Sequence, residues 1–143
     1  MMRVLFVCYG NACRSQMADV IARQDAADVM TVDSAGLVPL GYVPELTTST
    51  LVKNGYSGVG LKSKPISREV WAAAQLVVNM SGEPREQAFK DFAKVEDWDV
   101  EDPFGEDPAV YRRIFEEIRE RVAELAMRLR KKSKHRNPER TTV

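Results

Sequence analysis

The chain has 143 residues, of which 44% are hydrophobic and 29% charged, and its formal net charge is zero. This length suits one domain with a buried core, and the average apolar fraction excludes a chain that is disordered throughout. No apolar run approaches the roughly 18 to 20 residues that span a bilayer, and the N-terminus lacks the features of a signal peptide. Two cysteines and one histidine make neither a disulfide framework nor a structural zinc site. We therefore expect a cytoplasmic protein with no membrane segment, metal or other cofactor.

Basic residues gather at the C-terminal end of the chain. Seven Lys and Arg residues lie from Arg128 onward, against a single acid, Glu139. Such an end could bind nucleic acid or another anionic surface, but a solvated helix end that complements the helix dipole is the commoner case. We therefore expect a domain over residues 1–132, a basic, disordered tail over 133–143, and no nucleic-acid partner.

Short apolar runs alternate with segments of helical periodicity. The run over 3–7 is typical of a strand that is covered on both faces of a parallel sheet. The next segment places Met17, Val20 and Ile21 on one face of a helix. The expected elements, in chain order, are a strand over 3–7, a helix over 15–27, a strand over 29–33, helices over 45–54 and 68–74, a strand over 75–80, a short helix over 84–92, a strand over 95–98 and a helix over 108–132.

The last helix is the most clearly marked. Asp107 is expected to cap it and Pro108 to begin it. Its apolar residues recur at helical spacing and form one stripe, namely Tyr111, Ile114, Ile118, Val122, Leu125 and Leu129. We expect Trp71 and Trp98 to pack in the core.

The alternation of strands and helices predicts the fold class. It indicates an α/β protein, a single three-layer domain with a four-stranded parallel sheet and helices on both faces. Ligands of such sheets bind beyond the carboxyl ends of the strands. The loop after the first strand is therefore the expected site.

That loop runs from Cys8 to Ser15, with five residues between Cys8 and Arg14. A loop of this length that returns to a helix start can direct several backbone N–H groups to one centre and bind an anion. Arg14 can hold two oxygens of a phosphate there. The same field stabilises a thiolate, so Cys8 is expected to be nucleophilic. Gly10 and Asn11 are residue types that tolerate left-handed backbone.

Cys8 to Ser15 resembles the signature loop of the low-molecular-weight protein tyrosine phosphatases, a family that also contains thioredoxin-coupled arsenate reductases. The resemblance extends over about residues 3 to 130. It implies that Ser34, in a Ser-Ala-Gly segment, supports Asn11, and that Asp102, in an Asp-Pro pair, is the general acid. It also implies a phosphate-binding loop made of Tyr9, Gly10, Asn11, Ala12, Cys13 and Ser15.

Two of these roles have competing interpretations. Asp102 lies in an acidic stretch with a second Asp-Pro pair at Asp107, but Asp107 is better explained as the helix cap, which leaves Asp102 as the acid. Cys13 is either a packed loop residue or, as the resemblance implies, the partner of Cys8 in a reversible disulfide. The single histidine, His135, lies in the basic tail, so a Cys–His dyad is not expected.

The resemblance implies a phosphatase in which Cys8 attacks phosphorus, Arg14 and the loop amides hold the oxygens, and Asp102 protonates the leaving group. An arsenate reductase is an alternative, because Gln16-Met17-Ala18 resembles that branch. Ser81 stands where its internal thiol cascade needs a cysteine, so an external small thiol would be required. A phosphocarrier of the sugar-transport type would need neither Arg14 nor Asp102.

The substrate is least well defined by the sequence. Tyr9, Tyr42 and Phe104 are candidates for the rim of the pocket. The Asp-Pro-Phe-Gly segment resembles bacterial members, including protein-arginine phosphatases, in which a loop threonine favours phosphoarginine. Ala12 stands at that position here. We therefore favour phosphotyrosine, in a protein or as a small aryl phosphate, over phosphoarginine, and expect a monomer.

Overall fold

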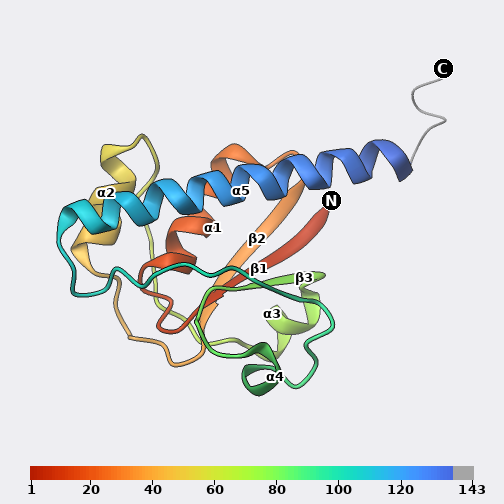
Figure 1. Ribbon diagram of the computed structural model, residues 1–143, viewed down its shortest axis with the longest axis horizontal. Helices are drawn as coiled ribbons and strands as arrows, with labels where there is room; N and C mark the ends of the chain where they lie inside the picture. The colour runs from red at the N-terminus through yellow and green to blue at the C-terminus, as the bar shows by residue number, and fades with distance from the viewer. Residues whose placement is uncertain (137–143) are drawn as a thin grey trace.

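The computed structural model of the protein describes residues 1–136 (Figure 1). Every element expected from the sequence is present, with its ends shifted by a few residues. The elements are β1 (Met2–Cys8), α1 (Arg14–Asp25), β2 (Met30–Gly36), α2 (Glu45–Lys53), α3 (Arg68–Ala73), β3 (Leu76–Asn79), α4 (Arg85–Ala88), β4 (Val95–Asp97) and α5 (Pro108–Arg136).

The four strands form one parallel sheet in the order β2-β1-β3-β4. β1 pairs on both sides, with Leu5 opposite Asp33 of β2 and Val77 of β3. The chain therefore passes from β1 to one side of the sheet and returns to the other. Ligands of open α/β sheets bind where strand order reverses in this way, beyond the carboxyl ends of the strands. The loop after β1 lies at that point.

Helices cover both faces of the sheet (Figure 1). The side chains of β1 alternate between two cores, as the pleat requires. Val4 and Phe6 belong to a core shared with α1 and α5, and Leu5 and Val7 to a smaller core that includes Phe89. This arrangement confirms the predicted three-layer α/β fold.

The long helix α5 packs against α1 and α2, and its apolar stripe belongs to the same core as Val4 and Phe6 of β1. The Asp107 carboxylate accepts the N–H of Val110 at 3.0 Å, so Asp107 caps this helix as predicted. Each residue of the stripe is at most 7% exposed, including Tyr111, Ile114, Ile118, Val122, Leu125 and Leu129.

The end of α5 differs from the expectation. Arg130 donates two hydrogen bonds to the Asp28 carboxylate, at 2.8 and 2.9 Å, and so holds the C-terminal half of the helix to the body. The helix continues to Arg136, so residues 133–136, expected in a disordered tail, form its last turn. The rest of the expected tail, 137–143, lies outside the described residues. Within 1–136, no helix is long and apolar enough to cross a membrane.

β2 is longer than the sequence indicates. The expected strand over 29–33 ends before Ser34-Ala35-Gly36, but these residues lie within β2 because β1 continues alongside and pairs Cys8 with Gly36. A Cβ at Gly36 would lie 2.8 Å from backbone atoms of Gly10 and Asn11. The end of β2 therefore touches the loop that follows β1.

The two tryptophans pack as expected, one on each side of the sheet. Trp98 is buried, with its ring centroid 5.8 Å from that of Phe6. Trp71 is half-buried and stacks on Phe89 at 5.4 Å. Neither side chain lines the hollow at the loop after β1.

We expect Ile118→Ala to lower the free energy of unfolding by about 2–5 kcal/mol, because it leaves a cavity beneath α5 where Ile118 is fully buried. Met127→Ala on the same helix, where the side chain is 56% exposed, should change it by about 0.5 kcal/mol or less. Urea unfolding followed by circular dichroism measures both. Equal losses would contradict the assignment of the buried face of α5.

Candidate active site

The loop between β1 and α1 is held by its carbonyl oxygens. Those of Cys8, Tyr9 and Gly10 accept the N–H groups of residues 37, 38 and 40 at 3.1, 2.8 and 3.0 Å. The Ala12 carbonyl accepts the Thr47 hydroxyl at 2.9 Å. With the carbonyls bonded outward, the N–H groups of residues 10–13 donate to no other group in the described chain. This is the arrangement of an anion-binding nest.

Cys8 lies at the bottom of this loop, 2% exposed. Its sulfur is 2.9 Å from the Ser15 hydroxyl and 3.4 Å from the Ser15 N–H. The Asn11 amide donates to the same hydroxyl at 2.7 Å, which leaves the hydroxyl hydrogen for the sulfur. Two donors and the N-terminus of α1 thus present partial positive charge to the Cys8 sulfur.

The backbone of the loop corrects one expectation and confirms another. Asn11 has a φ of 49°, the left-handed conformation predicted for it. Gly10, also expected there, does not have a positive φ. An asparagine is among the few residues other than glycine that adopt this conformation readily.

Ser34 does not have the role expected of it. Its hydroxyl is buried without a hydrogen-bond partner among the described residues, so it does not hold Asn11. The Asn11 side chain bonds instead to Ser15, Gln16 and the Lys64 N–H. Gln16 and Lys64 were missed because nothing in the sequence places the segment around residue 64 against the loop.

Arg14 is 5% exposed, and one nitrogen of its guanidinium is already hydrogen-bonded within the protein. Nη1 donates to the carbonyl oxygens of Met80 at 2.5 Å and Val100 at 3.1 Å. Nε is buried without a partner in the described chain, and Nη2 lies 3.5 Å from a carboxylate oxygen of Asp102. Nε and Nη2 form one edge of the guanidinium, so that edge remains available to grip two oxygens of an oxyanion.

The structure brings Asp102, and not Asp107, to the loop. One Asp102 oxygen accepts the Phe104 N–H at 3.1 Å, and the other faces Arg14. The Asp102 side chain is 50% exposed, which leaves it open to solvent and to a leaving group. Asp107 is used as the cap of α5. Of the two Asp-Pro pairs, the one at Asp102 therefore lies at the pocket, and the one at Asp107 begins α5.

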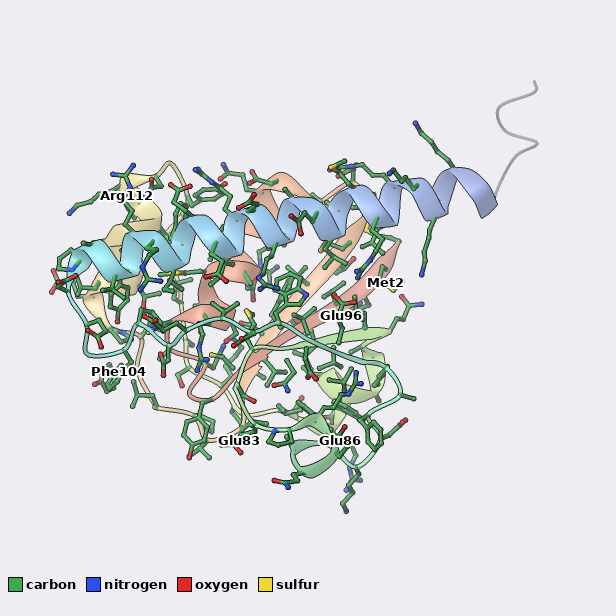
Figure 2. All side chains as sticks on the ribbon, in the orientation of Figure 1. Met2, Glu83, Glu86, Glu96, Phe104 and Arg112 are labelled. Carbon is green, nitrogen blue, oxygen red and sulfur yellow. The ribbon has the colours of Figure 1, made fainter. Side chains whose placement is uncertain are left out.

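These groups line one pocket of about 340 Å³. Its walls are mostly apolar, and Phe104 marks its rim at the end of the molecule away from Met2 (Figure 2). Tyr42, predicted for the rim, is exposed but does not line the pocket. The lining residues are Cys8, Tyr9, Gly10, Ala12, Cys13, Arg14, Val38, Pro39, Leu40, Asp102 and Phe104.

Cys13 lines the same pocket as a free thiol. Burial raises the pKa of the Cys13 thiol, against the opposing effect of its hydrogen bonds with Thr47 and Tyr111. Its sulfur lies 3.3 Å from the Tyr111 hydroxyl, whose pKa burial also raises. These contacts fit a packed loop residue. The disulfide with Cys8 stays a prediction.

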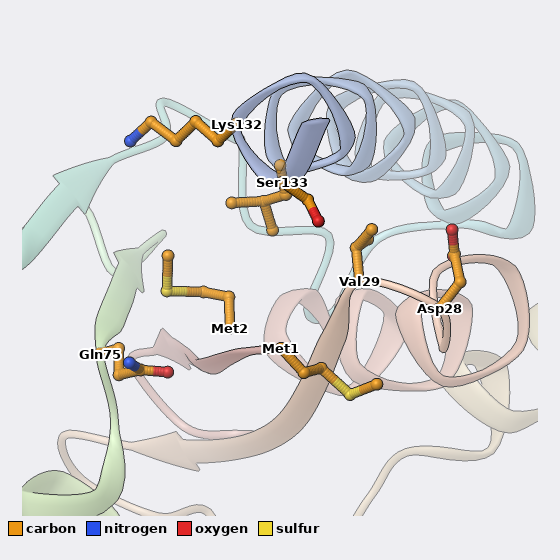
Figure 3. Close-up of a pocket in the computed structure, with 8 residues that line it drawn as sticks. Met1, Met2, Asp28, Val29, Gln75, Lys132 and Ser133 are labelled. Carbon is orange, nitrogen blue, oxygen red and sulfur yellow. The ribbon is translucent and has the colours of Figure 1, made fainter. Parts of the chain in front are cut away.

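A second hollow, of about 390 Å³, lies at the opposite end of the strands, between their amino-terminal ends and the end of α5 (Figure 3). Met1, Met2, Val29 and Leu129 give it an apolar lining, and Lys132 lies at its rim. None of its lining residues is a cysteine or histidine. Both cysteines of the chain line the pocket at the loop instead.

Fold and pocket together define an α/β protein with a free cysteine, an arginine and an aspartate in one pocket, at the loop that follows the first strand. The chain belongs to the low molecular weight phosphotyrosine protein phosphatase family, whose model matches residues 3–135.

Its relatives within that family differ in activity. The chain is 31% identical to a glutaredoxin arsenate reductase from Synechocystis, over 90% of this chain and 99% of the relative. It is similar to a low molecular weight protein tyrosine phosphatase from T. tengcongensis, at 28% identity and a TM-score of 0.82, over 90% and 100% of the two chains. It is also similar to a Cys-to-Ser mutant of the arginine phosphatase YwlE with a phosphorylated active-site serine, at 27% identity and a TM-score of 0.81, over 91% and 97%.

The close approach of β2 to the loop yields a contrast between two glycines. We expect Gly36→Ala to lower both stability and activity, because its Cβ would lie 2.8 Å from rigid loop backbone. Gly10→Ala should be tolerated, because its Cβ would meet its nearest neighbour at 3.5 Å and its φ is not positive. Melting temperature and aryl phosphate turnover of both variants check this. A Gly10 variant that is the more damaged of the two would contradict it.

Proposed function

We propose that this protein is a cysteine-dependent phosphatase that hydrolyses phosphotyrosine, in proteins or as small aryl phosphates, through a phosphocysteine intermediate. The observation that carries the proposal is the meeting of three groups in one pocket. They are the Cys8 sulfur with its two donors, the free edge of the Arg14 guanidinium, and the Asp102 carboxyl. We further propose that it acts as a cytoplasmic monomer.

The first step transfers the phosphoryl group to sulfur. The Cys8 thiolate attacks phosphorus and forms the S–P bond while the bond to the leaving oxygen breaks. Nε and Nη2 of Arg14, with the N–H groups of residues 10–13, hold the three non-bridging oxygens. Protonated Asp102 gives its proton to the leaving oxygen, which departs as a neutral phenol or alcohol.

The second step releases phosphate. Asp102, now ionised, takes a proton from a water molecule whose oxygen attacks phosphorus, and the S–P bond breaks. The returning thiolate is received by the Ser15 hydroxyl and N–H. The phosphorylated active-site serine of the YwlE mutant supports a covalent route in this family, because it places a phosphoryl group on the residue that replaces a cysteine.

The pocket wall favours an aryl group over a guanidinium. Val38, Pro39, Leu40 and Phe104 give an apolar surface that suits a phenyl ring. The phosphoguanidinium of phosphoarginine carries several N–H donors that need acceptors, and Asp102 is the one acid among the lining residues.

Arsenate reduction is the second candidate. Arsenate is a tetrahedral oxyanion, and one relative is named a glutaredoxin arsenate reductase. The whole chain has two cysteines, Cys8 and Cys13. Ser81, which stands where a further thiol would be needed, uses its hydroxyl to bond Asn79 at 2.6 Å. A reductase cycle would therefore need an external thiol.

One assay series separates these candidates. The purified protein is given phosphotyrosine peptide, phosphoarginine peptide and arsenate with glutathione and glutaredoxin or with mycothiol. We expect phosphotyrosine to have the highest kcat/KM. A higher value for phosphoarginine, or thiol-dependent arsenate reduction without phosphatase activity, would overturn the proposed substrate.

Cys8→Ser should reduce aryl phosphate turnover to background while leaving the fold and phosphate binding intact. Serine is nearly isosteric with cysteine but has no accessible anion at neutral pH. Turnover of p-nitrophenyl phosphate and the rise in melting temperature with inorganic phosphate measure the two properties. Clear turnover by a preparation free of wild-type enzyme would exclude the covalent mechanism.

Asp102→Asn should slow hydrolysis of phenyl phosphate by roughly a hundredfold, the usual size of a general-acid contribution. The loss should shrink for p-nitrophenyl phosphate, whose leaving group needs little protonation. Asp107→Asn is the matched control, because asparagine caps a helix about as well as aspartate. A leaving-group dependence in the Asp107 variant alone would show that the general acid is Asp107 and not Asp102.

A further inference from the structure

Gln16 is a buried polar residue next to the site, and the mechanism does not use its side chain. It is in the first turn of α1 and is 2% exposed. Its Nε2 lies 3.0 Å from the Asn11 carbonyl, 3.1 Å from Asn11 Oδ1 and 2.7 Å from the Lys62 carbonyl. Backbone carbonyls accept and never donate, so the atom that faces them must be the amide nitrogen. The orientation of this amide is therefore fixed.

The orientation of the Asn11 amide is fixed in turn. The Lys64 N–H donates to Oδ1 of Asn11 at 2.9 Å, and Gln16 donates to the same oxygen. With its oxygen turned to these two donors, Asn11 presents Nδ2 to the Ser15 hydroxyl at 2.7 Å. A flipped Asn11 amide would set nitrogen against both donors.

The direction of the last hydrogen bond follows. Because Ser15 Oγ accepts from Asn11, its own hydrogen is available to Cys8 Sγ at 2.9 Å. If Asn11 turned its oxygen to Ser15, the hydroxyl hydrogen would be drawn to that oxygen, and a lone pair would face the sulfur. A chain of hydrogen bonds therefore runs from Gln16 through Asn11 and Ser15 to the Cys8 sulfur, and each donor in it points toward Cys8.

Gln16 also ties α1 to the segment that supports the loop from outside. In that segment, residues 62–65, the Ser63 hydroxyl donates to the Gly10 carbonyl at 2.9 Å, and the Lys64 carbonyl accepts the Gly36 N–H at 2.8 Å. Asn11, at a φ of 49°, needs such neighbours, since a residue in this region persists where its surroundings hold it.

We propose that Gln16 is a positioning residue for the nucleophile. By fixing the Asn11 amide it directs the Ser15 hydroxyl hydrogen to Cys8, and so raises the fraction of Cys8 present as thiolate. The proposal rests on the proposed function only in that Cys8 is the nucleophile. It assigns Gln16 no contact with substrate.

Gln16→Met tests this, because methionine keeps the length of the side chain and removes the donor. Gln24→Met is the matched control, since Gln24 lies on the same helix and its amide also donates to a loop carbonyl, that of Gly55 at 3.4 Å, away from the site. The first readout is the rate of Cys8 alkylation by iodoacetamide from pH 5 to 9, followed by peptide mass mapping. The second is kcat/KM for p-nitrophenyl phosphate over the same range.

For Gln16→Met we expect alkylation near pH 6 to slow by about threefold to tenfold, the effect of one weakened hydrogen bond. The acidic limb of both profiles should move to higher pH, while the inhibition constant of inorganic phosphate changes little. Gln24→Met should match the wild type. If Gln16→Met does not give a native circular dichroism spectrum, Gln16→Glu takes its place, and its carboxylate should slow alkylation at least as much.

Two results would overturn the proposal. One is a folded Gln16 variant whose alkylation profile matches the wild type at every pH. The other is an equal loss of alkylation rate in the Gln24 variant. That result would show a general effect of removing a side-chain hydrogen bond from α1. Alkylation does not require turnover, so a protein that hydrolyses no phosphate would count against the proposed function and leave this test readable.

Discussion

The site depends on the outward hydrogen bonds of the loop carbonyls. The carbonyl oxygens of Cys8, Tyr9 and Gly10 are bound by the segment after β2, and that of Ala12 by Thr47 of α2. A short loop whose carbonyl acceptors are all paired on the outside can turn its N–H donors inward, at the N-terminus of a helix. The Cys8 sulfur, the edge of the Arg14 guanidinium and the Asp102 carboxyl are all placed relative to that ring of N–H groups.

Most of the fold and the centre of the site follow from local patterns in the sequence. Apolar runs and helical periodicity mark the sheet and α5, and the spacing from Cys8 to Arg14 marks the loop that lines the pocket. Asp102 could be separated from Asp107 because helix capping is itself local. Each of these features depends on residues close together in the chain.

The features that the sequence did not predict depend on contacts between distant segments. The Ser-Ala-Gly segment remains in β2 because β1 runs beside it, and the buried Ser34 hydroxyl finds no partner there. Tyr42 lies outside the pocket, which is walled instead by Val38, Pro39 and Leu40. Gln16 reaches Lys62, 46 residues away. The local propensities of the residues do not predict such contacts between distant segments.

The ion pair between Arg14 and Asp102, at 3.5 Å, gives the Arg14 guanidinium a counter-ion within the protein. An anion that enters meets a guanidinium that already has a carboxylate oxygen 3.5 Å from Nη2, so it gains less than it would from a bare cation. Chloride, with one charge and no fork of oxygens, competes poorly on those terms. A phosphate dianion brings two charges and the geometry that matches both free N–H groups of the arginine edge. On these terms an oxyanion with two oxygens to offer gains more from Arg14 than a simple anion does.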